Sequence, residues 1–287
     1  MTKRLLVLAA LLALLLPTDI LSADGLNLTA RSAILMDMTT GRILYAHNSE
    51  APIQPASITK ILTLYVADEA IEAGKVHLRD TVKISRKAGH TGGSKMYIQP
   101  GSEIPLEQLL TGVAVVSAND ASVAVAEHIA GDVDEFVERM NLKAQELGMT
   151  KSVFKNPNGL PAKGQVTTAR DMLTLAYEYL RRFPKSLQIH SQQFFTYRHI
   201  TQHNRNTLLA HYPNADGLKT GWVSAAGYHL IATAKRGETR LIAVVMGAKN
   251  PRIRAKETER LLDEGFRMVL PQRANPDSCQ SGCEKAS

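Results

Sequence analysis

The sequence predicts an α+β fold in which one antiparallel sheet is flanked by terminal helices and interrupted by an all-helical insert. Near the start, segments 32–38 and 42–46 alternate like strands around the turn residues 39–41, which is the pattern of a β-hairpin. Because strand patterns occupy both ends of the chain and helical periodicity fills the middle, we expect one sheet with an insert at roughly 65–210. The strand-like segments near the end are residues 217–222, 227–235 and 239–246.

Helical periodicity is clear in the segment that begins at Ser57, where apolar side chains recur at i, i+3, i+4 and i+7. We expect this helix to be among the most buried. Asp120 is expected to cap the helix that begins at Ala121, and residues 167–171 have the pattern of a second cap. The run Leu241 to Met246 is apolar without alternation, as expected of a strand covered on both faces. The remaining predicted segments are helices at 105–113, 134–147, 172–181 and about 250–269, short strands and loops at 80–104, and a strand at 193–200.

The N-terminal stretch has the layout of a signal peptide. Lys3 and Arg4 precede the apolar run 5–16, and small residues before Asp24 offer a cleavage site after Ala23. The apolar run is short for a membrane span. We therefore expect export, followed by cleavage. The predicted units are a signal peptide (1–23), a main domain (24–270) with its helical part at about 65–210, and a flexible tail (271–287).

Ser57-Ile-Thr-Lys60 combines a hydroxyl nucleophile and an amine at the start of a predicted helix. Residues three apart share one face of a helix, so the two side chains are expected to be neighbours. The unpaired N–H groups of the first turn favour a developing negative charge near Ser57. Burial lowers the pKa of an amine, so Lys60 could act as a base on the hydroxyl. This motif alone is weak, because serine at a helix start is usually only a cap.

Two further motifs stand at predicted element boundaries. Ser117-Ala-Asn119 lies between two helices, and Lys219-Thr-Gly221 lies in a strand near the sheet edge. Side chains at such boundaries can converge on one cleft. The ordered set of three motifs resembles the serine D-alanyl-D-alanine carboxypeptidases, the low-molecular-weight penicillin-binding proteins. The likeness runs from about Arg31 to Arg267 and implies a β-lactamase/transpeptidase-like fold.

The resemblance also implies roles for individual residues. Ser57 is expected to be the nucleophile and Lys60 the base that activates it. Ser117 is expected to relay a proton to the leaving amine, while Asn119 orients the peptide. The backbone N–H groups of Ser57 and Trp222 are expected to form the oxyanion hole.

The strand motif is expected to bind the substrate. By resemblance, Lys219 supplies a positive field and Thr220 contacts the substrate carboxylate. Gly221 lets the strand backbone come close. Arg254 lies where family members have an arginine that helps bind the terminal carboxylate.

The reaction implied is removal of the terminal D-alanine from peptidoglycan stem peptides through an acyl-enzyme on Ser57, with β-lactams as inhibitors. One alternative is a D,D-endopeptidase that cleaves peptidoglycan cross-links. A β-lactamase is less favoured, because residues 156–165 contain no acidic side chain to activate a deacylating water. A non-catalytic sensor of the wall or of β-lactams is disfavoured by the intact Ser57 and Lys60.

Composition limits the remaining function classes. A net charge of +7 suits an anionic cell envelope or an acidic substrate, although simple solubility explains it equally well. There is no dense Lys/Arg run and only 5% aromatic residues, so nucleic acid is not an expected partner. The nine histidines show no His-Glu-x-x-His spacing, so we expect no metal and no cofactor. Cys279 and Cys283 could pair in an oxidising compartment, but the sequence leaves this open.

Many family members continue into a β-rich second domain and an amphipathic membrane anchor. This sequence ends about twenty residues after Phe266. The expectation is a soluble, periplasmic protein with no stable membrane anchor after cleavage.

Overall fold

The structure, a computed structural model, describes residues 26–273. Its centre is a five-stranded sheet in the order β2-β1-β9-β8-β7, in which all neighbouring strands are antiparallel. The N-terminal hairpin therefore joins the three C-terminal strands in one sheet, as predicted. The strands are β1 (Ser32–Asp37), β2 (Arg42–His47), β7 (Ala215–Val223), β8 (Gly227–Arg236) and β9 (Thr239–Ala248).

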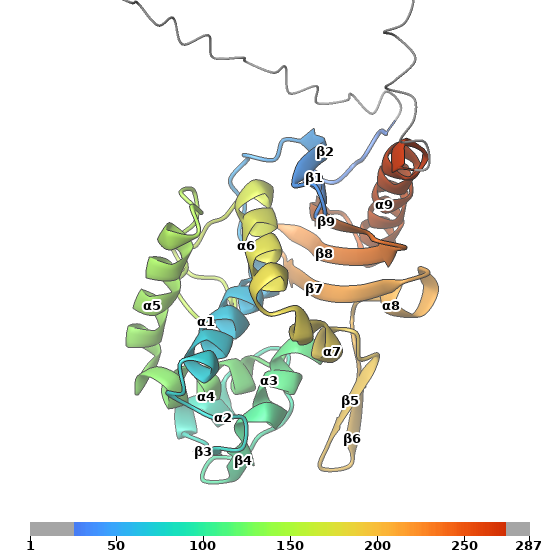
Figure 1. The fold of residues 1–287 in the computed structure, drawn as a ribbon. Helices are drawn as coiled ribbons and strands as arrows, with labels where there is room; N and C mark the ends of the chain where they lie inside the picture. Colours follow the sequence, from blue (N-terminus) through green and yellow to red (C-terminus); the bar gives the residue numbers. More distant parts are fainter. Residues whose placement is uncertain (1–25, 274–287) are drawn as a thin grey trace, which may run out of the picture.

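Helices cover both faces of the sheet (Figure 1). Ala243 and Val245 of β9 pack in the cluster that includes α9 (Pro251–Arg273), whereas Val244 and Met246 pack in the cluster that includes α6 (Ala169–Arg182). This explains why the β9 sequence is apolar without alternation. The predicted antiparallel sheet flanked by helices is confirmed, although the helices that flank it are not all terminal. In the described part of the chain only α9 is terminal, and α6 comes from the insert.

The helix that follows Ser57 is the centre of the insert. α1 (Lys60–Glu72) is buried continuously over its first eight residues, as predicted, because it contacts α3, α4, α5 and α6. An amine on its first turn is therefore far from bulk water. The surrounding helices are α3 (Leu106–Val115), α4 (Asn119–Ala130) and α5 (Val133–Glu146).

The insert is not all-helical. Two small antiparallel sheets lie within it. The first falls at 80–104, where short strands were predicted, but the single strand predicted at 193–200 is instead a two-stranded hairpin that extends to His203. The second is a hairpin that projects from the body beside α7 (Figure 1). These elements are β3 (Thr81–Lys83), β4 (Glu103–Pro105), β5 (Phe194–Tyr197), β6 (Ile200–His203), α2 (Arg86–His90), η2 (Pro184–Ser186), α7 (Leu187–His190) and α8 (Leu208–His211).

The two predicted caps have different outcomes. Thr168 caps α6, because its hydroxyl accepts a hydrogen bond from the Asp171 N–H at 3.0 Å. Asp120 is not a cap, since α4 begins one residue earlier and its N-cap is Ala118. The buried Asp120 carboxylate instead accepts from the N–H groups of Met96 and Ile98, at 3.1 and 3.2 Å. It fixes that loop against the start of α4.

Some predictions lie outside the described residues. They include the signal peptide at 1–23, the Cys279–Cys283 pair and most of the tail. The predicted domain end at 270 falls inside α9, which continues to Arg273. Within residues 26–273, no helix has both the length and the apolar character needed to cross a membrane.

We predict that Leu262→Ala on α9 lowers the free energy of unfolding by about 2–5 kcal/mol, because Leu262 is fully buried against the sheet. Urea unfolding followed by circular dichroism measures this. Leu270→Ala is the matched control on the same helix, since that side chain is 37% exposed. Equal losses from the two variants would contradict the packing described for α9.

Candidate active site

The turn that contains Ser57 is a 3₁₀ turn, η1 (Ala56–Thr59), and α1 begins directly after it at Lys60. In a 3₁₀ turn the side chains three residues apart eclipse each other. The Lys60 Nζ and Ser57 Oγ are accordingly 3.1 Å apart. Ala56, just before the serine, has the left-handed φ of +49°, which is uncommon for a residue with a Cβ. Such strain is often found at functional turns.

The Lys60 amine has three partners. Besides Ser57 Oγ, they are Asn119 Oδ1 at 2.7 Å and the Asn158 carbonyl at 2.5 Å. Two of the three are carbonyl oxygens, which can only accept. A neutral amine has two N–H donors for them and one lone pair for the Ser57 hydroxyl, so all three contacts are satisfied without a positive charge.

Burial is also what shifts the Lys60 pKa. The side chain is fully buried, which disfavours the charged form, and the positive charge of Lys219 acts in the same direction. The pKa is therefore held well below its ordinary value of 10.5, against a smaller opposing effect of Asp120. A buried, uncharged amine that contacts a hydroxyl can act as its general base.

Ser117-Ala-Asn119 lies at the turn between α3 and α4. The Asn119 amide bridges Lys60 and the Gly92 carbonyl, to which its Nδ2 donates at 2.8 Å. Ser117 is buried and has a left-handed φ of +63°. Among the described residues, the hydrogen bonds reach Asn119 from Lys60 but do not reach the Ser117 hydroxyl. The structure thus places the Asn119 side chain in contact with Lys60. Ser117 is two residues earlier in the sequence and does not share this hydrogen bond.

The loop at residues 156–165 forms another wall of the site. The Asn158 carbonyl accepts from Lys60, and the Pro157 carbonyl accepts from Thr63 of α1 at 2.6 Å. At Gly159 (φ +79°) a Cβ would lie 1.9 Å from the Ala56 carbonyl oxygen, so only glycine fits there. In the sequence, residues 156–165 were noted for the absence of an acidic side chain. The contact could not be read from it, because a backbone carbonyl can come from any residue.

Strand β7 lies against the other side of the turn. A Cβ at Gly221 would be 3.1 Å from the backbone nitrogens of Ser57 and Ile58, so this glycine permits the close approach that was predicted. β7 is the edge strand of the sheet, so one side of its backbone has no strand partner. Its Thr220 is buried. The Trp222 side chain points away from the turn, is 55% exposed and lies on Tyr228 with ring centroids 5.7 Å apart.

Two arginines, Arg205 and Arg254, lie close to Lys219 of β7. Lys219 is buried, its Nζ donates to the Thr220 carbonyl at 3.1 Å, and burial lowers its pKa to about 7. The charges of Arg205 and Arg254 add to that shift. Arg254 is itself buried; it donates to the Arg205 carbonyl at 3.0 Å, and its Nε has no hydrogen-bond partner.

Arg205 is a site residue that the sequence reasoning missed. It stands in no motif, and only its place in space, beside Arg254, connects it to Lys219 and Lys60. The resulting arrangement is a hydroxyl and a buried amine of lowered pKa next to several cations. It suits nucleophilic attack on a substrate that has a nearby anionic group. Within residues 26–273 no three His, Cys, Asp or Glu side chains are grouped as metal ligands.

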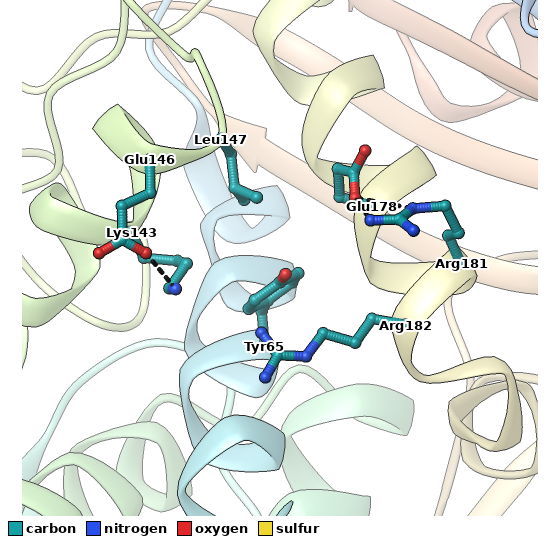
Figure 2. A pocket seen from close by; sticks show the side chains of 7 residues that line it. All are labelled: Tyr65, Lys143, Glu146, Leu147, Glu178, Arg181 and Arg182. Atoms are coloured by element: carbon teal, nitrogen blue, oxygen red, sulfur yellow. Dashed lines mark hydrogen bonds and ion pairs between the residues drawn. The ribbon is translucent and has the colours of Figure 1, made fainter.

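A separate hollow of about 600 Å³ opens between α1, α5 and α6 (Figure 2). None of the predicted site residues lines it. Each of its cations is paired with a carboxylate: Lys143 with Glu146, and Arg181 with Glu178. Arg182 pairs with two glutamates of α1. The hollow is therefore lined by a surface network of ion pairs and by Tyr65, and it is separate from the site around Ser57.

The sequence profile of the peptidase S11 family, described as D-alanyl-D-alanine carboxypeptidase, matches residues 19–250. The chain belongs to this family. The S11 chain is 41% identical over 253 residues to the D-alanyl-D-alanine carboxypeptidase DacC of Escherichia coli, covering 86% of this chain and 63% of DacC. It is 41% identical over 242 residues to DacF of Bacillus subtilis, covering 83% of this chain and 62% of DacF.

Solved structures agree with the fold of the S11 chain. Penicillin binding protein 5 from Haemophilus influenzae superposes with a TM-score of 0.82 at 41% identity, covering 84% of this chain and 72% of that chain. The S11 chain thus spans under two thirds of the length of the two curated relatives named above. The β-lactamase/transpeptidase-like fold inferred from the motifs is confirmed.

The Lys219 pKa gives a prediction for stability. In the unfolded chain the amine has its ordinary pKa of 10.5, and in the folded protein about 7. Between these values the unfolded state binds more protons, so stability rises with pH across this window. Lys219→Met removes this contribution. We expect the stability of wild type relative to Lys219→Met to increase between pH 7 and about pH 9.5, as measured by urea unfolding.

Lys83→Met is the matched control for loss of a lysine, since Lys83 is exposed on β3. A difference between wild type and Lys219→Met that stays constant with pH would contradict the lowered pKa.

Proposed function

We propose that this chain is a serine-type D-alanyl-D-alanine carboxypeptidase that removes the terminal D-alanine from peptidoglycan stem peptides. The single observation that supports this most is the 3.1 Å contact between Ser57 Oγ and the buried Lys60 amine, whose pKa is lowered. Family membership supplies the substrate class. The local geometry supports the assignment of roles.

The proposed reaction begins when neutral Lys60 takes the proton of the Ser57 hydroxyl. Oγ attacks the carbonyl carbon of the scissile peptide bond, and the oxyanion is held by the N–H groups of Ser57 and Trp222. The closeness of Gly221 to the Ser57 nitrogen supports this pairing of donors. The C–N bond then breaks, and the leaving D-alanine amine receives the proton through Ser117. Water hydrolyses the ester and regenerates Ser57.

The proposed recognition of the substrate is electrostatic. The terminal carboxylate binds near Thr220, where Lys219, Arg254 and Arg205 supply positive charge. The unpartnered Nε of buried Arg254 supports an acceptor at this place. Asn119 is positioned by Gly92 and Lys60 to orient the peptide.

β-Lactams are proposed to acylate the same serine, because the structural neighbour from Haemophilus influenzae is a penicillin binding protein. The loop at 156–165 supplies Lys60 with a backbone carbonyl and has no acidic side chain. This supports slow release of the β-lactam rather than β-lactamase turnover.

We also propose that the protein is exported to the periplasm, where this substrate is found, after cleavage behind Ala23. The basic start and apolar run of residues 1–23 support this. N-terminal sequencing of the protein from a periplasmic extract tests it, and an intact Met1 would contradict cleavage.

Ser57→Ala is expected to abolish both release of D-alanine from a D-Ala-D-Ala pentapeptide and covalent labelling by benzylpenicillin. The fold should persist, because the Ser57 side chain caps no helix. Mass spectrometry of the intact protein and of the peptide products measures both activities. A lasting penicillin adduct on the wild type indicates a penicillin-binding protein, and rapid loss of the adduct indicates a β-lactamase.

Labelling of Ser57→Ala at another residue would overturn the assignment of the nucleophile. Cleavage of cross-linked peptide dimers in preference to the pentapeptide would favour the endopeptidase alternative. An unchanged pentapeptide would favour a sensor.

Lys60→Arg is expected to acylate almost as slowly as Lys60→Ala, since a guanidinium stays protonated at any working pH and cannot act as a base. In the wild type the acylation rate should rise with pH as the Lys60 amine loses its proton. Stopped-flow acylation by a chromogenic β-lactam measures both effects. An arginine variant that acylates at the wild-type rate would show that Lys60 provides only charge.

A further inference from the structure

His229 on β8 connects the segment before Ser57 to the sheet. Its ring is fully buried, and its Nε2 lies 3.0 Å from the carbonyl oxygen of Gln54. Its Nδ1 accepts the N–H of Gly247, at the end of β9, also at 3.0 Å. The imidazole therefore bridges two backbone groups that are nearly two hundred residues apart in sequence.

The two contacts determine where the ring proton sits. A backbone N–H can only donate, so Nδ1 must be the acceptor for Gly247. Nε2 then holds the proton and donates it to the Gln54 carbonyl. Burial, with a smaller effect of the Arg254 charge, lowers the His229 pKa to about 4, so the ring is neutral at neutral pH. Both hydrogen bonds are directional and leave the ring one orientation.

The place of this bridge matters for the site. Gln54 is three residues before Ser57, and Ala56 between them has strained backbone. In the β7–β8 register His229 is paired with Gly221, whose Cα faces the backbone nitrogens of Ser57 and Ile58. His229 thus contacts the segment that leads into the Ser57 turn, and it is also paired with β7, the strand that contains Gly221.

The two ring contacts have different functions. Gly247 lies where the β8–β9 register shifts and has a φ of +80°, so the Nδ1 contact stabilises a bulge in the sheet. The Nε2 contact instead reaches out of the sheet to the segment that leads into η1. Only this second contact can move Ser57 without disturbing strand pairing.

We propose that His229 is a positioning residue: through its bond to the Gln54 carbonyl it sets the position of Ser57 Oγ and the Ser57 N–H relative to β7, without touching the substrate. This inference rests on the proposed function. It adds a residue that no motif includes.

The test uses two amide substitutions. The Asn oxygen in His229→Asn occupies roughly the place of Nδ1 and keeps the acceptor for Gly247, but the donor to Gln54 is lost. The longer amide in His229→Gln places an N–H near Nε2 and keeps that donor. We expect His229→Asn to lower the rate constant for acylation of Ser57 by a chromogenic β-lactam about ten- to a hundredfold, the range expected for a misplacement near 1 Å.

In the same variant, the dissociation constant of the non-covalent β-lactam complex that precedes acylation should change less than about threefold, because the substrate contacts remain. His229→Gln should acylate within about threefold of wild type. Tyr212→Phe is the control for a merely destabilised protein. Its hydroxyl bonds Asp263 and Arg236 on the α9 side of the sheet, so its loss lowers the melting temperature without slowing acylation.

Equal acylation by His229→Asn and wild type, or equal slowing in both amide variants, would overturn the inference while leaving the proposed function intact. A wild type that forms no acyl-enzyme overturns the proposed function, and this inference with it. An independent check needs no variant. Nitrogen-15 NMR of the wild type should show Nε2 protonated and Nδ1 bare, and the opposite tautomer would overturn the proposal.

Discussion

The burial of one amine without a carboxylate partner is the constraint on which this site depends. Lys60 is enclosed because α1 lies at the centre of the insert and other helices pack around it. Burial alone would make the amine costly, since a polar group removed from water must find partners. Asn119 and Asn158 provide two acceptors, and Ser57 takes the third position. The packing of the helices around α1 thus determines how Lys60 can act on the Ser57 hydroxyl.

The site also depends on backbone groups that approach each other closely. The turn of Ala56 and Ser57 is held between the loop at Gly159 and the strand at Gly221, and neither glycine has room for a side chain without movement. His229 supports the same turn from the sheet. Three segments from distant parts of the sequence therefore locate the nucleophile, which explains how a strained turn can persist.

Local features of this protein could be predicted from the sequence, and features that need distant partners could not. Ser57 and Lys60 are three residues apart, and Thr168 caps a nitrogen three residues on, so each pairing is visible in the sequence. Asp120 was misread as a cap, because its true partners lie more than twenty residues away. Likewise, nothing local marks α6 as the helix that covers the second face of the sheet.

Arg205 was missed for the same reason, because only the folded structure brings it close to Lys219 and Arg254. The cluster of these three cations also has a consequence for binding. With a pKa of about 7, Lys219 is only partly charged at neutral pH, since burial and its cationic neighbours oppose the proton. A carboxylate bound beside it would reverse that balance and raise the pKa. Binding of an anion would then draw a proton from solution, so that the ligand and the proton enter together. The affinity for anions would weaken in alkaline solution, and the heat of binding would depend on the ionisation enthalpy of the buffer.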